Sequence, residues 1–432
     1  MARVSRGGNV MRKMKRNMIL LLWLVITLSV SGIAGAERYD AQGVPLRLER
    51  VLVLSRHNLR APLDSGMAVI SRLTPHEWFR WTAASGELSL RGGTLETLMG
   101  QYYRQWLEQE GLIPRNYVPA ENEVRFYANS YQRTIATTQY FSSGMLPIAN
   151  VRVERHLALN EPDPVFLPGF NGVDDEFVAR VMEEIDAAGG TRAIGESLAP
   201  EAALVAEVLD YPDSEAARES GLDYFPADDM ETVFTGDYFA IRGSLRPAMR
   251  AADALVLQYY EESVAYKAAF GHRLTREDWR GISRLGYMGV NSYFDLPTLS
   301  TRFAQPLLMV MRDELAREGR KFTFLCGHDT NLASVLTALG AGDYELSDAV
   351  EAKTPIGGKL TVEKWVDPDG QAYAALSLVY QNTEQIRRCL PLDLDHPPAI
   401  VPLRLAGLTP AAEGLYRYSD LLARLDSVLA AP

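Results

Sequence analysis

The sequence predicts an α/β fold, in which a mostly parallel sheet is flanked by helices and a mainly helical domain is inserted. Residues 50–55 and 322–326 form two short apolar runs of the kind found in strands buried on both faces. Each run is followed by a histidine in a polar loop and then by a helical pattern. Because strand and helix alternate in this way on both sides of a helix-rich middle stretch, we expect one discontinuous α/β domain.

The other expected elements follow from residue periodicity and turn residues. In the α/β domain we expect strands over residues 123–127, 151–154, 359–366 and 371–380, and helices over 94–110, 131–141, 301–318 and 415–429. In the middle stretch we expect helices over 176–187, 200–209, 245–262 and 276–293. The prediction is therefore an α/β domain formed by residues 37–161 and 301–432, with a helical cap domain formed by residues 162–300.

The first 36 residues have the order of an export signal. Basic side chains precede an apolar run over residues 18–30, and small residues follow, with Ala34-x-Ala36 as the expected cleavage site. The apolar run is 13 residues long, whereas a membrane-spanning helix needs about 20. We therefore expect a cleaved signal peptide rather than an anchor, and a periplasmic protein with no stable membrane association afterwards.

Composition narrows the possible partners. The formal net charge is −11, and it becomes −17 without the first 36 residues, which hold six basic and no acidic side chains. A surface this acidic argues against nucleic acid, so an anionic substrate needs a local cluster of arginines. The sequence leaves open whether its two cysteines, Cys326 and Cys389, form a disulfide, and it leaves the oligomeric state open.

The segment from Ser55 to Pro62 reads Ser-Arg-His-Asn-Leu-Arg-Ala-Pro and has the composition of a phosphate cradle. A phosphoryl group in transfer spreads negative charge over three oxygens, which planar guanidinium groups bind bidentately. Arg56 and Arg60 therefore predict phosphate binding around His57, whose imidazole can attack phosphorus and form a covalent intermediate. The alternative is a basic turn with a surface histidine, but its position directly after a buried strand favours the functional interpretation.

Two further segments supply candidate residues. His328 and Asp329 follow the second buried strand, so we expect them at the same sheet edge as His57. A protonated histidine there can bind phosphate oxygens, and Asp329 can protonate the departing alcohol as a general acid. Arg133 lies near the start of the helix expected over residues 131–141, where free N–H groups suit an anion. Its spacing alone fits an ordinary surface arginine equally well.

No metal or cofactor site is predicted. The sequence contains neither His-x-x-x-His nor His-Glu-x-x-His, and its acidic residues are dispersed. It also lacks the Gly-x-x-x-x-Gly-Lys-Ser/Thr loop of nucleotide-dependent kinases and ATPases. We therefore expect chemistry that needs no metal and no cofactor.

These residues resemble the histidine acid phosphatase family, which is branch 2 of the histidine phosphatase superfamily. Within it they are most similar to the group that contains bacterial periplasmic phytases and glucose-1-phosphatase. The resemblance extends from about residue 50 to the C-terminal helix. It is carried by the segments at residues 55–63, 127–134, 257–261 (Leu-Gln-Tyr-Tyr-Glu), 327–329 (Gly-His-Asp) and 354–359 (Thr-Pro-Ile-Gly-Gly-Lys).

The resemblance implies a role for each candidate residue and an exported acid phosphatase that works through a phosphohistidine. It implies His57 as nucleophile, Asp329 as proton donor, and Arg56, Arg60, Arg133 and His328 as phosphate ligands. Family members commonly have Gly after the nucleophile and Thr after the proline, whereas this chain has Asn58 and Leu63, as glucose-1-phosphatase does. Sugar phosphates such as glucose 1-phosphate are therefore the expected substrates, and phytase activity on inositol hexakisphosphate is the alternative.

Two other interpretations and one hypothesis about specificity remain. A phosphoglycerate-mutase-like phosphotransferase shares the Arg-His opening, but export disfavours it. A non-catalytic anion-binding protein on the same scaffold would be expected to have lost His57 or Asp329. The helical stretch is also acid-rich, which favours a neutral sugar with one phosphate. We hypothesise that one of its acids screens substrates at the cleft mouth, from the set Glu215, Glu219, Asp223, Asp228, Asp229 and Glu231.

Overall fold

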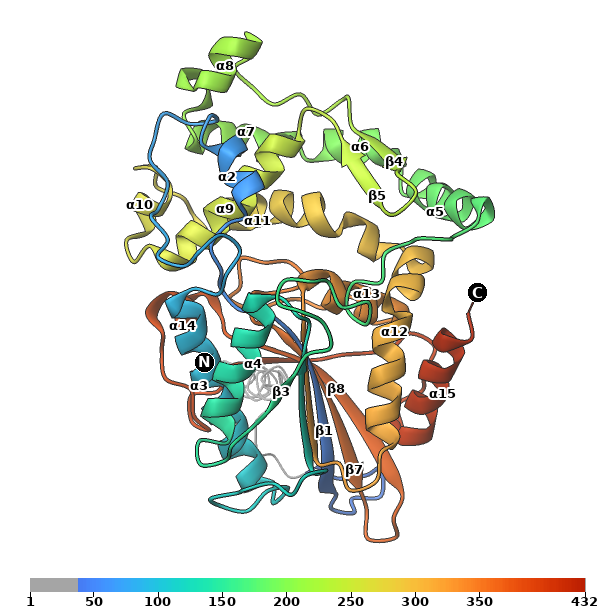
Figure 1. Ribbon diagram of the computed structural model, residues 1–432. Coiled ribbons are helices and arrows are strands. Elements are labelled where there is room, and N and C mark those ends of the chain that lie inside the picture. Colours follow the sequence, from blue (N-terminus) through green and yellow to red (C-terminus); the bar gives the residue numbers. More distant parts are fainter. Residues whose placement is uncertain (1–37, 432) are drawn as a thin grey trace, which may run out of the picture.

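The computed structural model describes residues 38–431, so the expected export signal lies outside the described residues. Its centre is an eight-stranded sheet with the order β10-β8-β7-β1-β6-β2-β3, and β9 pairs with β8 (Figure 1). The strands are β1 (Arg47–Arg56), β2 (Val124–Ala128), β3 (Val153–Glu154), β6 (Phe322–Gly327), β7 (Lys359–Val366), β8 (Ala372–Tyr380), β9 (Ala399–Pro402) and β10 (Tyr416–Arg417). In this part of the chain, no helix combines the length and apolar character needed to cross a bilayer.

The neighbouring strands β1, β6, β2 and β3 are parallel, whereas β7 pairs antiparallel with both β1 and β8. The predicted mostly parallel sheet with flanking helices is therefore confirmed. The two apolar runs of the sequence lie side by side as β1 and β6, with Val51 opposite Phe322 and Arg56 opposite Gly327. Their carboxyl ends consequently open at one edge of the sheet, where ligands bind in open α/β folds.

Both faces of β1 are covered, because its residues alternate between two cores. Val51 and Val53 belong to the core under helices α3 (Leu90–Gln109) and α4 (Gln132–Met145). Leu52 and Leu54 belong to the core on the opposite face, which contains residues of α12 (Pro297–Ala316), α13 (Asp329–Leu339) and α15 (Tyr418–Leu429). This burial on both faces explains the unbroken apolar run that the sequence shows at this strand.

A second, mainly helical layer lies beyond the carboxyl ends of β1 and β6, at the top of Figure 1. Its helices are α5 (Asp175–Ala187), α6 (Gly190–Ser197), α7 (Ala199–Val208), α8 (Glu215–Ser220), α9 (Arg246–Glu261), α10 (Ala265–Ala268) and α11 (Arg276–Asn291). Buried residues of α7, α9 and α11 share one apolar core. The inserted helical domain is thus confirmed, while its limits at residues 162 and 300 stay a prediction.

The structure adds elements that the sequence did not indicate. A short hairpin, β4 (Glu231–Phe234) with β5 (Phe239–Arg242), interrupts the helical layer. Helix α2 (Asp64–Ile70) is another such element, and its Ile70 packs in the same apolar core as residues of α7, α9 and α11. The remaining helix is α14 (Thr383–Arg388).

Candidate active site

His57 and His328 directly follow the parallel strands β1 and β6, and the two rings lie edge to face with centroids 5.4 Å apart. The two loops are joined by a backbone hydrogen bond, in which the N–H of His57 donates to the carbonyl of Gly327 over 3.0 Å. The sheet register therefore brings together two histidines that are distant in the sequence. This juxtaposition is the one that the sequence predicted.

The ring of His57 is set for nucleophilic attack. Its Nδ1 lies 2.9 Å from the carbonyl oxygen of Asn58 and must carry the proton to donate to it, which leaves the lone pair on Nε2. Burial, followed by the positive charge of Arg133, holds the pKa of His57 well below its ordinary value of 6.5. The imidazole is therefore neutral, which is the nucleophilic form.

Three arginines converge on this histidine from two segments of the chain. Arg56 and Arg60 flank it on the β1 loop, and Arg133 lies in the first turn of α4, as the sequence predicted. The Nε atoms of Arg56 and Arg133 are buried, and neither forms a hydrogen bond within the described chain. Burial and the nearby Arg60 lower the pKa of Arg133 to about 10, so it remains charged. Buried guanidinium donors of this kind suit the oxygens of a phosphate.

The hydrogen bonds of Asn129 determine the tautomer of His328. The Asn129 side-chain oxygen accepts from the backbone N–H of Ser130 and of Asp163, so its amide nitrogen donates to His328 Nε2 over 2.8 Å. Nε2 is then the acceptor and Nδ1 carries the proton, so the 3.4 Å approach of Arg133 Nη2 to Nδ1 is a contact between two donors rather than a hydrogen bond. Burial, with Arg133 next, lowers the pKa of His328. The expected protonated histidine is therefore wrong: His328 is neutral and can donate a single hydrogen bond from Nδ1.

Asp329 lies at the start of α13 and pairs with the arginine that precedes the nucleophile. Its Oδ2 is 3.2 Å from a terminal nitrogen of Arg56, and its Oδ1 accepts from the backbone N–H of Thr330 over 2.9 Å. Burial by itself raises the pKa of Asp329, but the surrounding positive charge, to which Arg56 contributes most, and the hydrogen bond from the Thr330 N–H together outweigh it, so the pKa lies below its ordinary value of 3.8. Without a bound anion, Asp329 is therefore a carboxylate.

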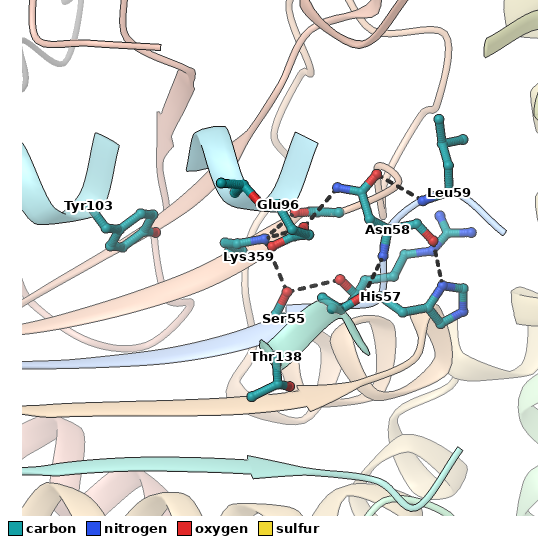
Figure 2. A network of polar contacts seen from close by, with 12 residues as sticks. Ser55, His57, Asn58, Leu59, Glu96, Tyr103, Thr138 and Lys359 are labelled. Carbon is teal, nitrogen blue, oxygen red and sulfur yellow. Dashed lines mark hydrogen bonds and ion pairs between the residues drawn. The ribbon is translucent and has the colours of Figure 1, made fainter. Parts of the chain in front are cut away.

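Behind the nucleophile lies a buried ion pair that the sequence reasoning missed (Figure 2). Lys359 Nζ is 3.0 Å from Glu96 Oε1, and both side chains are 0% exposed. Lys359 also donates to the Gly357 carbonyl over 2.8 Å and to Ser55 Oγ over 3.2 Å. Burial raises the pKa of Glu96, while Lys359 opposes that rise. Glu96 Oε1 accepts from both Lys359 and Asn58, whereas Glu96 Oε2 is buried and has no hydrogen-bond partner in the described chain.

Asn58 connects this pair to the nucleophile loop. Its amide nitrogen donates to Glu96 Oε1 over 2.8 Å, and its side-chain oxygen accepts from the backbone N–H of Leu59. The carbonyl of the same residue accepts from His57. The side chain that the sequence treated only as a departure from the family pattern therefore anchors the peptide that orients the nucleophilic ring.

The loop at Gly357 fits closely around Asn58. Gly357 has φ +68°, a conformation that favours glycine, and its backbone N–H donates to the carbonyl of His57. A Cβ atom added at Gly357 would overlap the Asn58 amide nitrogen. A larger residue would therefore displace the side chain that carries the nucleophile loop.

The candidate residues surround a cavity of about 390 Å³ between the sheet edge and the helical layer. His57, Arg60, Arg133, His328 and Asp329 line it, whereas Arg56 lines a smaller neighbouring cavity that also contains Asp329. The structure thus brings all six predicted residues together. In the described residues no group of three or more His, Cys, Asp and Glu side chains could hold a metal ion.

Helix α9 contributes cavity residues that the sequence reasoning did not single out. Asp253 lies 3.2 Å from Arg60, and Arg246 and Arg250 also line the cavity. A charged residue inside the otherwise apolar run at residues 251–257 is the one signal that could have identified Asp253.

The acid-rich stretch does not supply the acid at the cavity. Of its six acidic residues, all within the described chain, none lines the cavity. Glu215 and Glu219 pair with the exposed Arg72, and Asp229 accepts from Ser244. The hypothesis that one of them screens substrates at the mouth is therefore not supported.

The two cysteines are separate. Cys326 is buried in β6 and Cys389 follows α14, and both are free thiols. Burial raises the pKa of Cys326, so that thiol is unreactive at ordinary pH.

The family model and the relatives that match this chain agree with one another. Residues 47–169 match the model of the histidine phosphatase superfamily (branch 2). Over 384 residues the chain is 34% identical to a glucose-1-phosphatase of Salmonella typhimurium, and the aligned region covers 87% of this chain and 91% of the relative. It is 29% identical over 394 residues to phytase AppA of Escherichia coli, covering 85% of this chain and 88% of the relative.

A solved structure supports the same relationship. The phytase from Citrobacter braakii superposes with a TM-score of 0.80 at 26% identity, covering 89% of this chain and 98% of the phytase. The identity to glucose-1-phosphatase over most of both chains establishes the family. The chain therefore belongs to branch 2 of the histidine phosphatase superfamily and is a phosphomonoester hydrolase.

Proposed function

We propose that this protein is an exported acid phosphatase that hydrolyses sugar phosphates such as glucose 1-phosphate through a phosphohistidine at His57. The observation that carries the proposal is the geometry of that residue. Its Nδ1 donates to the Asn58 carbonyl, so a neutral Nε2 lone pair is available beside arginine side chains that have unused donors. Export is supported by the order of basic, apolar and small residues at the N-terminus.

In the first half-reaction, Nε2 of His57 attacks phosphorus and the bond from phosphorus to the ester oxygen breaks. Arg56, Arg60, Arg133 and the Nδ1–H of His328 bind the phosphoryl oxygens, where negative charge is spread in the transition state. The ester oxygen leaves as the alcohol after it takes a proton from Asp329. This step requires the protonated carboxyl, although the carboxylate is the form that Arg56 favours without an anion.

Substrate binding provides a reason for that protonation. A bound phosphate brings negative charge next to Arg56 and Arg60. This charge offsets the positive charge that lowers the pKa of Asp329. The pKa of Asp329 therefore rises in the complex, and the fraction that can donate is greatest at acidic pH. In the second half-reaction water attacks phosphorus, the P–N bond breaks, and the Asp329 carboxylate accepts the proton of that water.

Glucose 1-phosphate is supported as a substrate by the 34% identity to a protein named glucose-1-phosphatase, and by Asn58 and Leu63, which resemble the glucose-1-phosphatase pattern rather than that of typical phytases. The second candidate is phytase activity, which the likeness to phytase AppA and to the Citrobacter braakii phytase favours. Rates with glucose 1-phosphate, other sugar phosphates and phytate, measured with and without a chelator, separate these candidates. Faster turnover of phytate would contradict the first.

Trapping the covalent intermediate tests the chemistry itself. Rapid acid-quench experiments with radiolabelled substrate are expected to find label on the wild-type protein and none on His57→Ala. If His57→Ala kept near full turnover, the assignment of the nucleophile would be wrong. A protein that binds phosphate but never becomes labelled or releases alcohol would instead be a non-catalytic anion-binding protein.

A further inference from the structure

One face of helix α9 is turned toward the cavity. Five of its residues line the cavity at the spacing i, i+3, i+4, i+7 and i+8, which follows a single face of an α-helix: Arg246, Met249, Arg250, Asp253 and Ala254. Residues between them, among them Ala248, Ala251 and Ala252, are buried in the core of the helical layer. The side chains on this face are therefore held opposite the phosphate cradle by the packing of the helix behind them.

The charged residues that line the cavity differ in whether they have an ion-pair partner. Asp253 is paired with Arg60, and Asp329 is paired with Arg56. Arg246 and Arg250 have exposed side chains, and in the described part of the chain neither forms an ion pair or side-chain hydrogen bond. Both acids of the cavity are thus neutralised by the cradle, while two cations on the cap side are not. This local excess stands out in a chain whose formal net charge is −11.

The two arginines are displaced from the cradle along the helix. With a rise of 1.5 Å per residue, Arg250 and Arg246 lie about 5 and 10 Å along the axis from Asp253, the residue that contacts Arg60. They therefore face the end of the cavity away from the reacting phosphate. A sugar or inositol ring that carries a phosphate at each end can bridge such a span. Arg246 also begins the helix, so the partial positive charge of the N-terminus adds to its own.

We propose that Arg246 and Arg250 form a second anion-binding subsite, which favours phosphate monoesters that carry a second phosphate group on the far side of the ring. The inference rests on the proposed function, because it takes the cradle at His57 as the place of the reacting phosphate. Glucose 1-phosphate then fills the cradle alone, and a hexose bisphosphate fills both positions. The acid-rich stretch of the helical layer does not favour a neutral sugar here, because none of its six acidic residues lines the cavity.

The test compares glucose 1-phosphate with glucose 1,6-bisphosphate, which differ by one phosphate group. In the double variant Arg246→Gln/Arg250→Gln, kcat/KM for the bisphosphate is expected to fall at least tenfold more than kcat/KM for the monophosphate. Each partly solvated arginine accounts for about fivefold. The loss should be largely in KM, and for the wild type it should be reproduced in part by raising the salt concentration.

Arg273→Gln is the matched control, because Arg273 is exposed in the helical layer and does not line the cavity. It removes one positive charge and is expected to leave the ratio of the two kcat/KM values unchanged. Equal losses for both substrates in the double variant would overturn the proposal, since they would reflect general attraction of anions. No change for either substrate would overturn it as well.

A binding measurement separates this inference from the proposed function. His57→Ala retains the cradle arginines, so the affinity of each substrate can be measured by calorimetry without turnover. Tighter binding of glucose 1,6-bisphosphate that depends on Arg246 and Arg250 supports the subsite, even if the wild type turned over neither substrate and the proposed function failed. Equal affinities with and without the two arginines would refute the subsite, even if phosphoenzyme formation at His57 were demonstrated.

Discussion

Arg56 Nη2 and Asp329 Oδ2 form an ion pair of 3.2 Å across the carboxyl ends of the parallel strands β1 and β6. The guanidinium of Arg56 therefore contacts both the proposed proton donor, Asp329, and the phosphate group that we propose it binds. Without an anion this contact helps to hold the pKa of Asp329 below its ordinary value, against the opposing effect of burial. Binding of a phosphate is expected to raise that pKa, which couples occupancy of the site to the supply of a proton.

Replacing Asp329 should affect substrates according to their leaving groups. In Asp329→Asn the rate of phosphoenzyme formation from glucose 1-phosphate is expected to fall by about 10²–10⁴-fold, because the sugar oxygen must leave with a proton. The rate from p-nitrophenyl phosphate should fall far less, since nitrophenolate leaves without one. Single-turnover measurements with both substrates check this. Equal losses would show that Asp329 does not act as the acid.

The depressed pKa of His57 predicts the acid side of the pH profile. A histidine with a lowered pKa stays neutral until the pH falls below that pKa, so phosphoenzyme formation should persist well below pH 6.5. Arg133→Gln removes a positive charge that lowers the pKa of His57, and it should shift the acid limb to higher pH. The measurement is the rate of phosphoenzyme formation against pH at saturating substrate.

The exposed Arg152 provides the control for that shift. Arg152→Gln removes the same charge at a residue that does not line the cavity, and it should leave the acid limb where it is in the wild type. An unshifted limb in Arg133→Gln would mean that the limb reports a group other than His57.

Breaking the buried pair should destabilise the fold strongly. In Lys359→Met, Glu96 is left buried without its cation, and the free energy of unfolding is expected to fall by about 3–5 kcal/mol. The double variant Glu96→Gln/Lys359→Met should recover part of this loss because the unpaired charge is removed. Urea denaturation of the wild type and of each variant measures these free energies of unfolding. Arg388→Met, which breaks the exposed pair with Glu384, should cost less than about 1 kcal/mol.

Two glycines with similar backbone angles allow the packing at Asn58 to be tested. Gly357 has φ +68° and Gly370 has φ +83°, but only Gly357 would place its added Cβ against Asn58. Gly370→Ala should cost about 1–2 kcal/mol of stability and leave catalysis unchanged. Gly357→Ala should cost more and slow phosphoenzyme formation, since Asn58 orients the ring of His57. Similar rates in the two variants would contradict this positioning role.

Much of the fold follows from local pattern. The strand expected over residues 359–366 is β7 with the same limits, and the helix expected over 276–293 is α11, which ends two residues earlier. These elements have strong periodicity or a clear turn beside them. The hairpin of β4 and β5 has only four residues in each strand. It packs with Phe239 in the core beside α5, and that packing determines it rather than its own sequence pattern.

The candidate site divides in the same way. Arg56, His57 and Arg60 are close in the sequence, and His328 and Asp329 follow a recognisable buried strand, so their chemistry and their common sheet edge could be predicted. Asp253 and Glu96 could not be assigned partners. The first is 193 residues from Arg60, and the second is 263 residues from Lys359.

The sequence by itself determined which side chains could carry phosphoryl chemistry and at which edge of the sheet they would meet, because residue type and periodicity are local properties and the carboxyl ends of parallel strands share one edge. Only the tertiary structure decided which charges are neutralised and which are free. Asp253 pairs with Arg60 and Lys359 with Glu96, whereas Arg246 and Arg250 face the cavity without a partner in the described chain. The physical reason is that a side chain's charge state and partners depend on burial and on neighbours that arrive from distant parts of the chain.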